Sequence, residues 1–158
     1  MLSPANALHL LLAQGKQKIH EGNYRGALDE LFTAGYLLLK GDDQTRHQVE
    51  LHIGLCYMHE EDYEQALPRL ETAARTAHIS QNKETLALMH LSLAVCYKEI
   101  GIDEFLLEQR EHYKQQAKEN AQQARRLFAE LGNTEMIREL EEIIDEIDDG
   151  TEGWRDGD

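Results

Sequence analysis

The chain has 158 residues, 41% of them hydrophobic, and a formal net charge of -14. That length fits one domain with a core of its own, and the acidic surface disfavours binding to the phosphates of DNA or RNA. The sequence has no apolar run of about 18 residues that would predict a membrane span, and its two cysteines stand outside any dense cysteine framework, which favours a reducing cytoplasm.

The composition predicts helix throughout, because Gly and Pro are few and Leu, Ala, Glu and Gln are common. Ser3 and Pro4 are typical of a helix start, and Asn23, Asp62 and Asp103 are predicted N-caps of later helices. Turn residues separate the helices from one another. The predicted helices cover about 4–20, 24–40, 44–60, 63–79, 83–100, 104–131 and 134–147.

Two stretches repeat the same pattern. QKIHEGNYRGAL at 17–28 and CYMHEEDYEQAL at 56–67 both read His-Glu, two residues, Tyr, two residues, Ala-Leu. Gly15, Gly54 and Ala94 fall at one equivalent position of successive helix pairs, with a period of about 40 residues. Such a period indicates a helical repeat rather than one active site used twice.

These residues resemble the tetratricopeptide repeat (TPR) family, in a variant with a longer repeat. The family pattern is a helix hairpin with a small residue in the middle of the first helix, an aromatic residue three positions later, a Gly-Asp/Asn-Tyr turn, and two alanines seven apart in the second helix. The stretch IGLCYMHEEDYEQALPRLETA at 53–73 follows it closely. The first repeat matches best in its second half, and the third keeps LAVCYKEIG before departing from the pattern.

The resemblance implies an all-α, right-handed helical solenoid of three helix hairpins plus a C-terminal capping helix. We expect a single TPR domain over 1–148, with repeats at about 5–40, 44–80 and 83–131 and the capping helix at 134–147. Because residues 149–158 have no periodic apolar face, we expect a disordered acidic tail there. The apolar stripe of the cap would consist of Ile137, Leu140, Ile144 and Ile147.

The third repeat departs from the pattern in its second helix. Its alanine pair, Ala117 and Ala124, comes about eleven residues late, which preserves the facing of a helix and predicts one long sixth helix overhanging by roughly 16 Å. The apolar residues of that overhang either pack back on the fifth helix or form a lip for a partner or a second copy of the chain. They are Phe105, Leu106, Leu107 and Tyr113.

The sequence offers one metal-ligand pattern. His52, Cys56 and His59 lie at i, i+4 and i+7, a spacing that could hold zinc or copper. However, Cys96 is the repeat-equivalent of Cys56 and lacks both histidines, which favours small packed thiols. We therefore predict no metal and no cofactor, with a metal-responsive switch as an alternative. The chain has no Gly-rich phosphate loop, G-x-S-x-G or H-E-x-x-H motif, so we predict that it is not an enzyme.

The TPR resemblance implies that the first helix of each hairpin lines a concave groove that binds a protein or peptide. We expect a cytoplasmic, non-enzymatic adaptor, chaperone or regulatory scaffold with a basic or amphipathic partner and no contact with nucleic acid or membrane. The alternative is a self-assembly module that forms a homodimer through the long sixth helix or the cap. Ile19, Leu55 and Met58 would be exposed in an empty groove. The predicted groove residues are Leu12, Lys16, Ile19, His20, Leu51, His52, Leu55, Met58, His59, Leu91, Val95 and Lys98.

Overall fold

The computed structural model describes residues 3–38, 42–79 and 82–148, and every regular element within those ranges is helical. This confirms the all-α prediction. The chain divides into two compact units, Met1–Ser80 and Gln81–Asp158, called unit 1 and unit 2 below and described separately. The predicted disordered tail, 149–158, lies outside the described residues.

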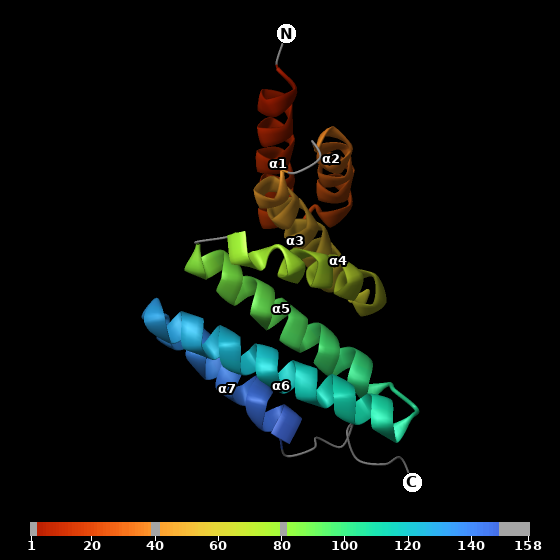
Figure 1. Ribbon diagram of the computed structural model, residues 1–158, viewed down its shortest axis with the longest axis vertical. Helices are drawn as coiled ribbons and strands as arrows, with labels where there is room; N and C mark the ends of the chain where they lie inside the picture. The colour runs from red at the N-terminus through yellow and green to blue at the C-terminus, as the bar shows by residue number, and fades with distance from the viewer. Residues whose placement is uncertain (1–2, 39–41, 80–81, 149–158) are drawn as a thin grey trace. The chain divides into compact units, whose positions relative to one another are not determined.

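Unit 1 consists of two helix hairpins (Figure 1). The first helix of each hairpin packs along the second, and α2 of the first hairpin also packs on α3 of the second. A short 3-10 turn, η1, follows α4. The elements are α1 (Pro4–His20), α2 (Tyr24–Leu37), α3 (Asp43–His59), α4 (Tyr63–Arg75) and η1 (Ala77–Ile79).

Side-chain caps begin the helices of unit 1 where the sequence predicts them. Ser3, Asn23 and Asp62 each accept a hydrogen bond from the backbone N–H three residues later, at 3.2, 3.0 and 3.3 Å. Each cap satisfies one of the N–H groups that a helix start leaves without a partner. Before two of these caps the backbone turns through positive φ, at Gly22 (80°) and at Glu61 (58°). The two hairpins therefore share one turn geometry at equivalent positions.

Both hairpins also close on the same contact between a glycine and a leucine. A Cβ atom on Gly15 would lie 2.9 Å from Leu31 Cγ, and one on Gly54 would lie 2.7 Å from Leu70 Cγ. Both leucines are fully buried. Because real Cβ atoms do not approach so closely, only glycine lets the two helices of each hairpin come this near. The repeat seen in the sequence is thus a repeat of packing.

Unit 2 consists of α5 (Lys83–Ile102), α6 (Leu107–Glu130) and α7 (Thr134–Asp148). α6 runs along α5, and α7 packs on α6 (Figure 1). Small residues again allow close contact, since the core where α5 meets α6 is mostly alanine. The predicted stripe of α7 faces this core, with Leu140 and Ile147 fully buried and Ile137 and Ile144 packed against it. The core alanines are Ala87, Ala94, Ala117, Ala121 and Ala124.

The α5 helix is also, among the described residues, the one helix long and apolar enough to cross a membrane by length and composition. Core helices pass the same test, and α5 buries seven of its residues. Its position in the core of unit 2 accounts for its hydropathy.

The turn of the third hairpin is not where the sequence predicts it. Gly101 lies buried inside α5, and Asp103 ends that helix instead of capping the next one. The sixth helix therefore begins at Leu107, three residues later than the predicted start at 104. Backbone contacts of Glu104 hold the turn, because its carbonyl accepts hydrogen bonds from Arg110 Nε and Nη2 at 3.2 and 3.0 Å. The family pattern misplaced this turn because Gly101 aligns with the turn positions of the earlier repeats.

The glycine–leucine contact predicts opposite signs for two glycine-to-alanine changes. Gly54→Ala should lower the free energy of unfolding by about 1 kcal/mol, because overpacking against Leu70 exceeds the gain in helix propensity. Gly35→Ala, also in a helix, should raise it by about 0.5–1 kcal/mol, since the nearest atom, Val49 Cγ1, is 4.0 Å from the new Cβ. Urea denaturation followed by circular dichroism measures both. Equal stabilisation by the two changes would contradict the tight contact.

Candidate functional site

Three apolar residues of the predicted groove are buried in unit 1. Leu12, Leu51 and Leu55 are 6%, 0% and 7% exposed, and Leu12 belongs to the core of unit 1. The expectation that Leu55 would be exposed in an empty groove is therefore wrong, because the apolar stripe of α3 serves as core. A Leu55→Glu variant would test folding rather than binding.

Two polar groove residues of unit 1, Lys16 and His52, form hydrogen bonds with Gln48. Lys16 Nζ donates to Gln48 Oε1 at 3.1 Å, and His52 Nδ1 donates to the Gln48 carbonyl at 2.6 Å. His59 lies apart from them, with its ring stacked on Tyr24 at 4.5 Å between centroids. Of the others in this unit, Ile19 and Met58 are partly exposed and His20 is exposed.

Three predicted groove residues belong to unit 2. Leu91 packs against the core of that unit, Val95 is partly exposed, and Lys98 forms an ion pair with Glu146 of α7. An ion pair within the unit leaves this lysine less available to a partner. A groove lined by residues of all three repeats stays a prediction.

The three residues of the metal pattern do not converge. Cys56 is fully buried, and burial, together with the nearby Glu60, raises the pKa of its thiol to about 12. His59 stacks on Tyr24. Within residues 3–38, 42–79 and 82–148, no three His, Cys, Asp or Glu side chains lie close enough together to hold a metal ion. Cys96 is buried in the same way, with a pKa also raised to about 12, so both thiols behave as small core side chains.

A pocket of about 200 Å³ opens between α2, α3 and α4, on residues that the sequence analysis did not select. We call it the Phe32 pocket. Its apolar lining comes from Phe32, Tyr36 and Leu38 at the end of α2 and from Val49 and Ile53 of α3. Its charged lining is Arg46, Glu50 and Arg69.

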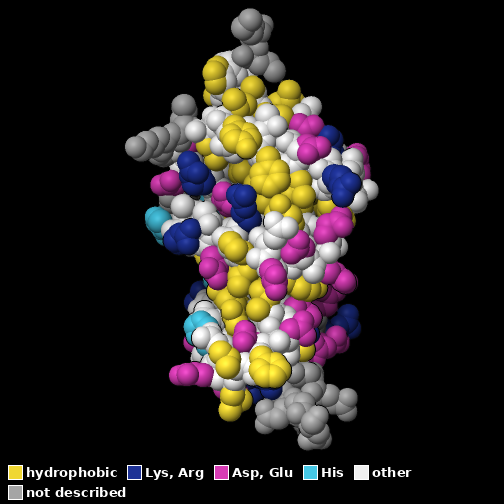
Figure 2. All heavy atoms as spheres, turned by 90° about the vertical axis from the view of Figure 1, so that its right-hand side faces the viewer, with side chains coloured by type: hydrophobic (Ala, Val, Ile, Leu, Met, Phe, Trp, Pro, Cys, Tyr) yellow, Lys and Arg dark blue, Asp and Glu magenta, His cyan; other side chains and the backbone are white. Residues whose placement is uncertain are grey.

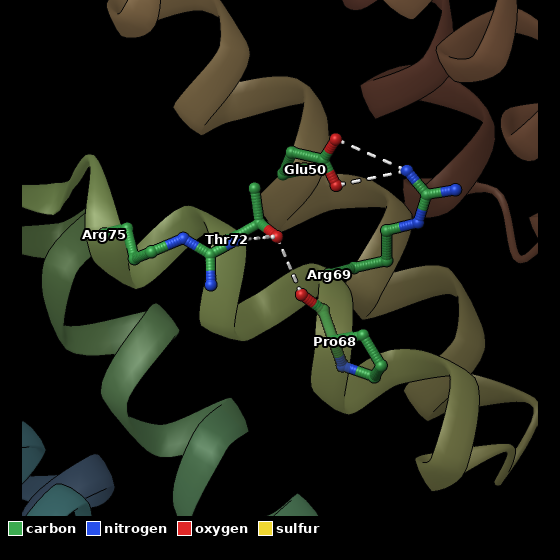
Figure 3. A network of polar contacts seen from close by, with 5 residues as sticks. All are labelled: Glu50, Pro68, Arg69, Thr72 and Arg75. Atoms are coloured by element: carbon green, nitrogen blue, oxygen red, sulfur yellow. Dashed lines mark hydrogen bonds and ion pairs between the residues drawn. The ribbon is translucent and has the colours of Figure 1, made fainter.

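On one side of the Phe32 pocket, Arg69 is paired with Glu50 (Figure 3). Arg69 Nη1 donates to both carboxylate oxygens of Glu50, at 3.3 and 3.2 Å. The same guanidinium lies over the ring of Phe32, with its carbon 5.3 Å from the ring centroid. Glu50 therefore neutralises Arg69, and Arg69 fixes the ring of Phe32 by a cation–π contact.

The opposite side of the pocket is open. Tyr36 is 89% exposed, although it lies within a helix and beside an apolar pocket. Arg46 is partly exposed, and its side chain forms no hydrogen bond or ion pair within the described residues. In the upper half of Figure 2, which shows unit 1, hydrophobic side chains gather into a patch with Lys and Arg side chains beside it. Exposed apolar patches of this kind usually mark contact sites.

A second pocket of about 200 Å³ is lined by residues of α2 and α3 and of the turn before α4. We call the line along which α2 meets α3 the seam. Leu28 lines the second pocket one helical turn before Phe32, and Tyr57 lines it one turn after Ile53. Arg25 also lines it, and the Arg25 side chain forms no ion pair or hydrogen bond within the described residues. The apolar residues of the two pockets thus lie one helical turn apart on α2 and on α3, and Glu60 and Asp62 add two carboxylates to the second pocket.

The sequence did contain a signal for this surface. Phe32 and Tyr36 are four residues apart on α2, so they share a face, and that face differs from the one that carries the packed Ala27 and Ala34. The family pattern drew attention to the first helix of each hairpin and away from the second. In the structure, however, Leu55 on a first helix is buried and Tyr36 on a second helix is exposed.

Unit 2 carries another exposed apolar group, at the turn between α5 and α6. Phe105, Leu106 and Leu107 are 95%, 62% and 61% exposed. Tyr113 instead packs back on α5, with its ring centroid 6.2 Å from that of Tyr97. The predicted overhang therefore divides into a packed part and an exposed part.

Comparison with known proteins adds no relative. No protein-family model matches the chain, and no curated protein matches it. A function for this chain therefore has to be argued from its own geometry.

His52 gives the site a dependence on pH that can be measured. Burial, opposed by the Gln48 carbonyl, lowers the pKa of His52 from 6.5 to about 4. Between these values the unfolded chain binds more protons, so the stabilisation is full above about pH 6.5 and is lost as the pH falls towards 4. From pH 7 to pH 5 the wild type should lose about 1–2 kcal/mol more unfolding free energy than His52→Gln.

Urea denaturation at each pH measures this difference. His20→Gln, at an exposed histidine of α1, is the matched control and should follow the wild type. Parallel losses in the wild type and His52→Gln would show that His52 does not contribute.

Proposed function

We propose that this chain is a non-enzymatic protein-binding module built from TPR-type hairpins. The repeated glycine–leucine contacts and the repeated caps and turns of unit 1 support the TPR assignment, since they use the positions of the sequence pattern. The composition of the Phe32 pocket supports binding over catalysis. Its described lining holds two guanidinium groups and one carboxylate already paired, and no Ser, Cys or His.

The observation that carries the proposal is the exposure of Tyr36 beside an open apolar pocket whose other wall is already fixed. A pocket of about 200 Å³ is smaller than the roughly 300–1,000 Å³ of typical small-molecule sites, so it suits one side chain of a protein partner. Covering Tyr36 and filling the pocket would each contribute about 1–3 kcal/mol before the costs of association. Because Arg69 already fixes the ring of Phe32, binding costs little side-chain entropy on this side of the pocket.

The partner would enter along the seam between α2 and α3. An apolar side chain would occupy the Phe32 pocket, and a second would reach Leu28 and Tyr57 in the adjoining pocket. Apolar anchors spaced along a helix seam are the pattern of peptide recognition by helical grooves. This surface replaces the apolar centre of the predicted groove as the primary candidate. A cytoplasmic location remains a prediction.

A displayed library of random twelve-residue peptides, with no free C-terminus, tests the proposal. Peptides selected on the wild type should lose at least about tenfold in affinity for Tyr36→Ser, because the exposed ring is the accessible wall of the pocket. Phe105→Ser removes an equally exposed aromatic ring from unit 2 and should bind like the wild type. Fluorescence anisotropy with the selected peptides measures both. Equal affinity for all three proteins would overturn the proposed site.

A second candidate function is self-association, and the exposed turn of unit 2 favours it. Three consecutive large apolar side chains, Phe105, Leu106 and Leu107, are more than half exposed. A soluble monomer rarely leaves such a group without a function. A second copy would cover this turn in a two-fold contact, which is the commonest form of assembly.

Sedimentation velocity at several protein concentrations tests self-association. If the turn is the contact, the sedimentation coefficient of the wild type should rise with concentration, whereas that of Phe105→Ser/Leu107→Ser should not. Tyr36→Ser is the control and should behave like the wild type. A wild type that stays monomeric at all concentrations would remove this candidate and leave peptide binding unaffected.

A further inference from the structure

We infer that the Phe32 pocket recognises an internal peptide segment in which an apolar anchor side chain is flanked by an Asp or Glu, and that Arg46 binds this carboxylate. The inference rests on the proposed function, since it names the partner chemistry of the same site. It differs from the groove expectation, which placed a basic or amphipathic partner on the first helix of each hairpin.

The charges around the pocket leave one cation available. Arg69 is committed, because it donates to both oxygens of Glu50 and lies over Phe32. The side chain of Arg46, one turn before Glu50 on α3, forms no hydrogen bond or ion pair within the described residues. A guanidinium can bind a carboxylate through two parallel hydrogen bonds, and this pairing is stronger than one between neutral groups.

The nearest acidic residues along α3 do not take this role. Asp42 caps the helix, and its side chain accepts a hydrogen bond from the Thr45 N–H at 3.2 Å. Asp43 is exposed in the first turn and forms no ion pair within the described residues. A partner that covers the pocket would remove water from Arg46, so a basic flank would meet an unpaired like charge and an acidic flank would supply its counter-charge.

The net charge of -14 opposes this choice at long range, and Asp43 near Arg46 and Glu60 and Asp62 at the second pocket oppose it nearby. At physiological salt, charges more than about 8 Å apart are largely screened, whereas a contact pair inside the covered pocket is not. The chain's overall charge therefore slows the approach of an acidic peptide, and Arg46 decides its register once it is bound.

The second pocket offers a bound segment contacts beyond its first anchor. Leu28 and Tyr57 of the second pocket lie one helical turn from Phe32 and Ile53 of the first. A bound chain can therefore make apolar contacts beyond its first anchor. The carboxylate at Arg46 is assigned to an Asp or Glu side chain of the segment, and a library without free C-termini tests that assignment directly. Specificity arises because the anchor and the carboxylate must both be present at a fixed spacing.

The twelve-residue display library, fused so that no C-terminal carboxylate is free, tests the inference. Wild-type selections should enrich an Asp or Glu at a constant spacing from the apolar anchor. Selections on Arg46→Gln should keep the anchor and lose the acidic preference. For one enriched peptide, changing its Glu to Gln should weaken binding to the wild type about fivefold and should not weaken binding to Arg46→Gln. Arg46→Lys keeps the charge and should retain part of the preference.

Arg25→Gln is the matched control, because Arg25 is another arginine without a partner among the described residues but lies at the second pocket. It should leave the acidic preference at the first anchor unchanged. Peptides that depend on Tyr36 but show no acidic preference, or a basic one, would overturn the inference and leave the proposed function standing. If no enriched peptide depended on Tyr36, the proposed function itself would fail.

Discussion

The close approach of two helices at a glycine is the constraint on which unit 1 depends. With Gly15 against Leu31 and Gly54 against Leu70, each hairpin closes tightly and sets the spacing at which α2 meets α3. A hairpin so closed cannot bury both faces of its second helix alone. The face of α2 that carries Phe32 and Tyr36 is not covered by α1, and it lines the Phe32 pocket between the two hairpins.

The two arginines that line the Phe32 pocket differ in their contacts. Arg69 pairs with Glu50 and lies over the ring of Phe32, so this cation fixes one apolar side of the pocket. The side chain of Arg46 is partly exposed and forms no ion pair within the described residues. Rigid apolar walls supply affinity at low ordering cost, and an uncommitted charge at the edge supplies selectivity. In the proposed site these two tasks fall to different residues.

Much of the helical layout could be predicted from local chemistry. Caps such as Asn23 and Asp62 depend on contacts within three residues, so the sequence alone locates those helix starts. The third hairpin turn could not be located in this way. There Gly101 continues the helix because it is buried, and the turn is held by a contact between Glu104 and Arg110, six residues apart.

By itself the sequence determined the helical class, the internal repeat and the small residues at which the helices pack, because periodicity and steric size are local properties. Tertiary structure decided which apolar faces are covered. Leu55 and Tyr36 look equally apolar in the sequence, yet one is buried and the other is 89% exposed. Burial depends on which elements pack against a face, and that information is distributed over residues far apart in the chain.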